Sequence, residues 1–81
     1  MNPDLKVAAV VLKELRRANK IHGNFRSIHE GYAVMLEEMD ELWDEIKKRY
    51  PDSRNLRCEA TQLAAMAMKL ILFLNNQEGY R

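Results

Sequence analysis

The sequence contains few of the residues that interrupt helices or crosslink chains. Its 81 residues include one cysteine, two prolines and three glycines. A single cysteine, Cys58, excludes an intramolecular disulfide, and no cysteine–histidine cluster suggests a zinc site. The longest apolar run, from Leu63 to Leu74, is interrupted by Lys69 and is too short for a membrane span of about 20 residues. We therefore expect one all-α domain, residues 1–81, that does not enter a membrane.

The net charge is also small, because 13 Lys and Arg side chains are nearly balanced by 12 Asp and Glu side chains. The charges are nevertheless segregated: residues 1–29 carry six basic and two acidic side chains, residues 30–46 carry seven acidic and none basic, and residues 47–57 carry five basic and one acidic. The acidic block disfavours nucleic-acid binding. It fits either a solvated helix face with basic neighbours or a cation site. No secretion signal is recognisable, so a cytoplasmic location is expected.

Capping and breaking residues predict three helices. Asn2 and Pro3 mark the start of the first helix, which is expected over residues 3–19, before Gly23 breaks the pattern. Ser27 with Glu30 three residues later forms a capping box for the second helix. The proline that follows Tyr50 ends that helix. The third helix is expected to begin at residue 53 or 55 and to end at residue 75 or 76.

The apolar residues of the second and third helices predict extensive packing. In the second helix a stripe flanked by Leu36 and Trp43 is expected to lie in the core, with Trp43 as a packing residue. That stripe contains Ile28, Tyr32, Met35, Met39, Leu42 and Ile46. The third helix is apolar on nearly every side, and two partner helices cannot enclose it. We therefore expect a three-helix chain that assembles into an oligomeric helical bundle, either a homodimer or a homotetramer.

Carboxylates on these two helices form a candidate cation site. Helical spacing places Glu38, Glu41 and Glu45 along one flank of the second helix. Glu59 and Gln62 project three residues apart from the otherwise apolar third helix. A carboxylate there needs a salt bridge, water or a metal ion. Facing pairs of this kind form an oxygen-rich cage that suits Mg²⁺, and Mg²⁺ in turn binds substrate phosphates, so a polyphosphate is the expected substrate.

The segment Glu37-Glu38-Met39-Asp40-Glu41 resembles the EExxE signature of the MazG-like all-α nucleoside triphosphate pyrophosphohydrolases. Their second signature, ExxD, lies on the next long helix, where this chain has Glu59-Ala60-Thr61-Gln62. The resemblance extends from about Phe25 to Phe73. It implies a hydrolase dependent on Mg²⁺, with Mn²⁺ as an alternative. Such an enzyme cleaves an NTP or dNTP between the α and β phosphates, releasing the monophosphate and pyrophosphate.

Carried onto this chain, the resemblance makes Glu38, Glu41 and Glu59 metal ligands. Gln62 takes the place of the expected aspartate as the fourth ligand, which removes one negative charge from the site. Glu37 matches the first acid of the signature, a group that orients water or supports a ligand. The expected catalytic set is therefore Glu37, Glu38 and Glu41.

The chain has no P-loop, so its basic side chains are expected to help the metal hold the phosphates. The candidates are Lys69, Arg26 and Lys20. Cys58 has no neighbouring base and is expected to be a small buried thiol. The alternative to an enzyme is a non-catalytic helical interaction module that keeps the fold and lacks turnover.

Overall fold

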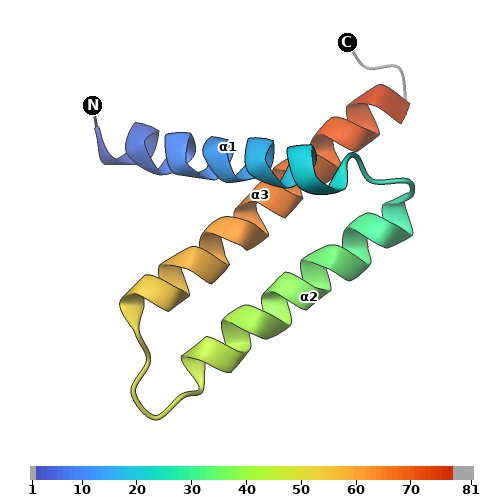
Figure 1. Ribbon diagram of the computed structural model, residues 1–81. Coiled ribbons are helices and arrows are strands. Elements are labelled where there is room, and N and C mark those ends of the chain that lie inside the picture. The colour runs from blue at the N-terminus through green and yellow to red at the C-terminus, as the bar shows by residue number, and fades with distance from the viewer. Residues whose placement is uncertain (1, 78–81) are drawn as a thin grey trace.

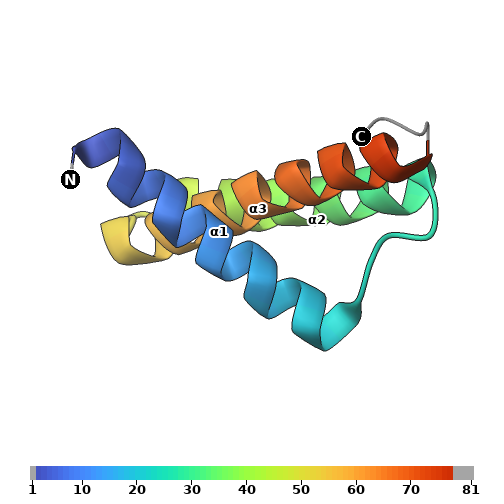
Figure 2. The same ribbon diagram turned by 90° about the horizontal axis from the view of Figure 1, so that it is seen from above.

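A computed structural model describes residues 2–77 and contains three helices, so the expected all-α class is confirmed. These are α1 (Pro3–His22), α2 (Ile28–Ile46) and α3 (Ser53–Gln77). Helices α2 and α3 run antiparallel, side by side, and α1 crosses α3 on one side of this pair (Figure 1). Seen from above, α2 and α3 form one layer and α1 lies against one face of it (Figure 2). None of the described helices is both long and apolar enough to cross a membrane.

The first helix begins where the sequence predicts and ends later. Asn2 Oδ1 accepts a hydrogen bond from the backbone N–H of Leu5 at 2.9 Å, which caps the start. The expected end at residue 19 is wrong, because the helix continues to His22. Gly23 then ends it with a φ of 73°, while its N–H donates to the Asn19 carbonyl at 2.9 Å. A left-handed φ favours glycine, so the stop lies at Gly23 itself.

The second helix is shorter than predicted. Ser27 caps it as expected, since Ser27 Oγ accepts from the backbone N–H of Glu30 at 3.0 Å. The predicted end at Tyr50 is wrong, because α2 ends at Ile46. The chain has to reverse direction before it can run back along α2, and the turn occupies residues 47–52. The third helix begins at Ser53, where Asp52 Oδ1 accepts from the Arg54 N–H at 2.8 Å.

The buried core lies between α1, α3 and the segment that joins α1 to α2. Its six buried apolar residues are Val11, Leu15, Ala18, Phe25, Ala65 and Met66. The only buried residue of α2 is Gly31. A Cβ atom at Gly31 would lie 2.9 Å from Leu70 Cδ1 and 3.3 Å from Phe25 Cδ2. The missing side chain therefore lets α2 approach α3 and Phe25 closely.

The predicted core stripe of α2 is largely wrong for the single chain. Met35 and Leu42 are half-buried, but the other members of the stripe and the flanking Leu36 and Trp43 are exposed. The third helix is not enclosed either, since its buried residues are Ala65, Met66 and Lys69. The reason is geometric: with a shortest dimension of 19 Å, the described chain is two helix layers thick, and α1 covers one face of the α2–α3 layer.

Candidate metal centre

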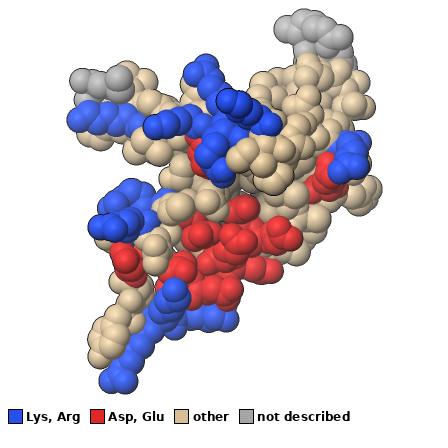
Figure 3. All heavy atoms as spheres, in the orientation of Figure 1, with Lys and Arg blue, Asp and Glu red and all other residues tan. Residues whose placement is uncertain are grey.

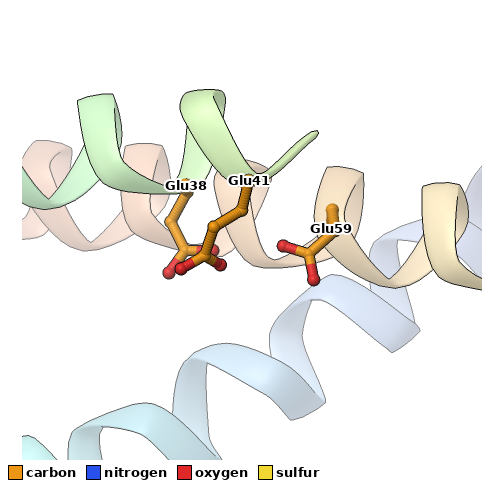
Figure 4. A group of neighbouring side chains, drawn as sticks. All are labelled: Glu38, Glu41 and Glu59. Atoms are coloured by element: carbon orange, nitrogen blue, oxygen red, sulfur yellow. The ribbon is translucent and has the colours of Figure 1, made fainter. Parts of the chain in front are cut away.

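Three glutamates from two helices meet beside α1. Glu38 and Glu41 lie one turn apart on α2, and Glu59 extends from α3 toward them (Figure 4). One carboxylate oxygen from each of the three lies within 4.8 Å of the others. Spacing of three residues on α2 and the antiparallel pairing of α2 with α3 produce this arrangement. The acids that the sequence predicts as metal ligands are therefore brought together.

Several carboxylate oxygens near this cluster are buried without a hydrogen-bond partner. They are Glu38 Oε2, Glu59 Oε2 and Glu45 Oε1. The other oxygen of Glu45 accepts from Lys48 Nζ at 2.9 Å. Burying a carboxylate oxygen without a partner costs free energy, because it loses its hydration shell. A bound cation would supply the missing partner.

The pKa values of two of the glutamates are raised. Burial, reinforced by the charges of Glu41 and Glu59, raises the pKa of Glu38 to about 7. Burial and the adjoining Glu41 carboxyl also raise the pKa of Glu59, with the charge of Glu45 contributing. Both shifts have the same physical origin, the repulsion of carboxylates crowded away from water. A divalent cation would oppose both shifts, because it stabilises the ionised forms.

The wider acidic block divides into paired and unpaired side chains. Ion pairs join Glu30 to Arg26, Asp44 to Lys47 and Glu45 to Lys48 in the described residues. Four acids of the block, residues 30–46, form no ion pair with any of residues 2–77, and they are Glu37, Glu38, Asp40 and Glu41. In the space-filling view the acidic side chains gather over α2, with Lys and Arg on α1 and near the α2–α3 connection (Figure 3). Basic neighbours thus account for part of the block and leave its centre uncompensated.

A cavity of about 410 Å³, here called the central cavity, lies between α1 and the α2–α3 pair. Its acidic end includes Glu37, Glu38 and Gln62. At its other end lie Phe25, Arg26 and Lys69, and the volume falls in the range typical of small-molecule sites. The lining also contains Glu30, which is paired with Arg26, and Arg17, which is paired with Glu14. The cavity therefore offers both oxygen ligands and cations.

Lys69 is the buried cation of this cavity. Its Nζ atom lies 4.6 Å from the centre of the Phe25 ring, a cation–π contact. Burial lowers the pKa of Lys69, although the charge of Glu30 partly opposes the shift. Lys69 forms no ion pair with any of residues 2–77. A buried ammonium group of this kind favours an anionic ligand in the cavity.

The remaining predicted site residues differ in their positions. Glu37 is exposed on α2 and lines the cavity, whereas Lys20 is exposed on α1 and is not among the lining residues. Arg26 lines the cavity while its Nε lies 3.5 Å from Glu30. Gln62 Nε2 is 3.7 Å from Cys58 Sγ, and the expected burial of Cys58 is wrong, since that thiol is exposed. Helix α3 turns Cys58 toward an open groove beside α1 rather than into the core.

Sequence reasoning missed the contribution of α1 to the cavity. Glu14, Arg17 and His22 line it, and Arg17 donates to Glu14 at 2.9 and 2.7 Å. This contact lowers the pKa of Glu14 against the opposing effect of burial. The spacing of these residues, with Ala18 between them, places them along one side of α1 next to its apolar stripe. That polar edge was the available signal, but an early helix end at residue 19 assigned His22 to a loop.

Comparisons of the chain with protein-family models, curated proteins and solved structures gave no match. The functional interpretation therefore depends on the site geometry and on the signature residues of the chain itself.

Proposed function

We propose that the protein is a Mg²⁺-dependent nucleotide pyrophosphohydrolase of the MazG-like type, cleaving an NTP or dNTP to the monophosphate and pyrophosphate. The carrying observation is the meeting of Glu38, Glu41 and Glu59 from two helices, with ligand atoms within 4.8 Å of one another. Their order along the chain follows the two signatures that the sequence resembles. A cytoplasmic location, where nucleotides and Mg²⁺ are both present, belongs to the same proposal.

A metal ion is favoured over simple solvation because two carboxylate oxygens of the group have no partner. Glu38 Oε2 and Glu59 Oε2 are buried, and the pKa of each residue is raised. Mg²⁺ binds oxygen ligands and retains several waters, so a few carboxylates suffice when substrate oxygens complete the shell. Gln62 lines the same cavity and is the proposed fourth oxygen donor. Mn²⁺ has similar ligand preferences and is the alternative ion.

A polyphosphate substrate is favoured by the opposite ends of the central cavity. Metal-bound phosphate oxygens would lie near the glutamates, and Lys69 and Arg26 would meet the remaining negative charge. The side chain of Lys69 is already directed over Phe25 by the cation–π contact. Lys20 is the weakest of the three proposed phosphate ligands, because it does not line the cavity.

In the proposed reaction a water oxygen attacks the α-phosphorus, and the bond from that phosphorus to the oxygen bridging the α and β phosphates breaks. Pyrophosphate leaves with the bridging oxygen, and the attacking water gives up a proton. Glu37, which is exposed at the cavity, is the proposed group that orients the water and accepts this proton. The metal would neutralise charge on the phosphates during the displacement.

The experiment is a screen of NTPs and dNTPs for pyrophosphate release with Mg²⁺ and with a chelator. We expect Mg²⁺-dependent release of equal amounts of monophosphate and pyrophosphate from at least one nucleotide. Glu38→Gln should abolish this release, and the exposed Asp40→Asn is the matched control on the same helix. Metal binding without release from any nucleotide would contradict the enzyme and favour the helical interaction module.

A further inference from the structure

The face of the α2–α3 pair that points away from α1 is apolar and uncovered. We call it the outer face and define it by eight large apolar side chains. They are Ile28, Tyr32, Leu36, Met39, Trp43, Ile46, Met68 and Ile71. Each retains between 36% and 65% of its accessible surface. A face of this size is unusual on a chain that has no partner.

The outer face lies on the opposite side of α2 from the candidate metal centre. At about 100° per residue, Met39 and Trp43 lie about 160° around the helix from Glu41 and about 100° and 140° from Glu38. Glu38 lines the cavity beside α1, so the apolar stripe is directed away from α1. In the view from above, α1 lies on one side of the α2–α3 layer and no described helix lies on the other (Figure 2).

On α3 the outer face is built largely from small residues. Ala60, Ala64 and Ala67 share one side of the helix with Ile71, because they are three or four residues apart. Small side chains let another helix approach the backbone closely, while the large side chains of α2 can fill the space beside them. The face therefore combines a ridge of large side chains on α2 with a shallow strip of small side chains on α3. In a pair of copies, the ridge of each copy can pack into the strip of the other.

The exposed area matches what a stable dimer needs. At about half exposure, eight large side chains leave roughly 900 Å² uncovered, close to the ~800 Å² that each partner buries in a standard interface. The chain's own core contains six buried apolar residues, and no large side chain within residues 2–77 is completely buried. A core this small is marginal for a chain of this length, so the missing burial is needed whenever the chain is folded. A second copy of the same chain is the partner that is always present.

We infer that two copies of the chain pack outer face against outer face about a two-fold axis, giving a four-helix layer with one α1 on each side. This inference names the surface for the expected oligomer and is independent of the proposed enzyme activity. It also explains why an apolar stripe with helical periodicity occurs on α2 outside the core of the single chain. The candidate metal centres of the two copies then lie on opposite sides of the dimer.

The first test needs no variant. Trp43 is the only tryptophan and is 55% exposed in the single chain. At micromolar concentration we expect a mass of at least twice the 9.5 kDa of one chain, together with the blue-shifted Trp43 emission of a buried indole. The melting temperature should rise with protein concentration. A mass of 9.5 kDa with the emission of a water-exposed indole and a concentration-independent melting temperature would overturn the inference.

The second test separates this surface from other exposed apolar residues. Met39→Glu places a charge at the centre of the outer face and should weaken self-association by about 100-fold or more, or unfold the chain if assembly and folding are coupled. Ile21→Glu is the matched control, because Ile21 is 59% exposed but lies on α1, away from the outer face. The control should retain the wild-type mass. An unchanged mass in Met39→Glu, or equal dissociation of both variants, would place the interface elsewhere.

Discussion

The two faces of the α2–α3 pair come from the same helices and differ in almost every physical property. The face toward α1 carries crowded carboxylates, a buried lysine and a cavity of about 410 Å³. The outer face carries large apolar side chains and no described covering. Both sets of side chains alternate along the 19 residues of α2. One amphipathic helix thus carries crowded carboxylates on one flank and exposed apolar side chains on the other, and these are the surfaces assigned to the proposed metal centre and the proposed dimer.

The largest expected effect comes from removing the charge of Glu38, which lies on the face of the α2–α3 pair toward α1. Glu38→Gln should lower pyrophosphate release by about 100-fold or more, because it removes one of three anionic ligands from the metal. The mass of the assembly should stay the same, since Glu38 is not part of the outer face. Assays of release and light scattering on the same sample measure both. A loss of activity that accompanies dissociation would show that the two faces are not separate.

Lys69→Met tests whether the buried ammonium group of the central cavity contacts the phosphates of the substrate. Loss of a charge-assisted contact to phosphate should raise KM by about ten-fold, in line with roughly 1.5–3 kcal/mol for such a hydrogen bond. The melting temperature should not fall, because methionine keeps the apolar contacts and removes a buried cation that has no ion pair within residues 2–77. Lys6→Met, at an exposed position of α1 that does not line the cavity, is the control and should leave KM unchanged. Equal changes in both variants would argue against a directed phosphate contact.

Gln62→Asp tests the fourth proposed ligand. Restoring a negative charge should tighten Mg²⁺ binding by about five-fold, equivalent to about 1 kcal/mol after desolvation. Gln62→Asn is the control of matched length without the charge, and it should not tighten binding. Calorimetric titration with Mg²⁺ measures the difference. Unchanged affinity in Gln62→Asp with a lower melting temperature would place residue 62 outside the metal shell.

The smallest expected effect is on the pH dependence of stability without metal. Because the folded-state pKa of Glu38 is about 7 and its ordinary value is 4.5, the folded chain binds more protons than the unfolded chain between these values. The free energy of unfolding should therefore fall as pH rises from about 4.5 to 7, by about 1 kcal/mol after allowance for solvent screening. Denaturant melts at several pH values measure it. Glu38→Gln should flatten the slope, and a wild-type slope of opposite sign would contradict the burial of this carboxyl.

The sequence predicted most of the local structure. Cap residues located the starts of the first two helices, because Asn2 and Ser27 accept hydrogen bonds from neighbouring backbone groups. The start of α3 at Ser53 is one of the two expected positions. Helix ends were harder to predict. The continuation of α1 to His22 and the early end of α2 at Ile46 depend on how the chain turns toward the next helix, which local residues do not determine.

The sequence also predicted the acidic cluster. It could not show which helix faces lie in the core, at the candidate site or on the surface of the single chain. Spacing alone put Glu38 and Glu41 on one flank, and the antiparallel pairing brought Glu59 to them. The same spacing assigned Met39 and Trp43 to a core that the single chain does not form. The polar edge of α1 marked Arg17 as a candidate, but its place in the cavity depended on the crossing of α1 over α3, which is a long-range arrangement.

The most direct test of the proposed metal centre is a melting experiment on the wild-type chain at pH 8, with and without excess Mg²⁺. The same experiment is repeated with Glu38→Gln and Asp40→Asn. A cation that binds only the folded chain stabilises it in proportion to RT ln(1 + [L]/Kd). We expect Mg²⁺ to raise the melting temperature of the wild type and of Asp40→Asn and to leave Glu38→Gln unchanged. No shift in the wild type, or the same shift in all three proteins, would contradict a metal centre at Glu38, Glu41 and Glu59.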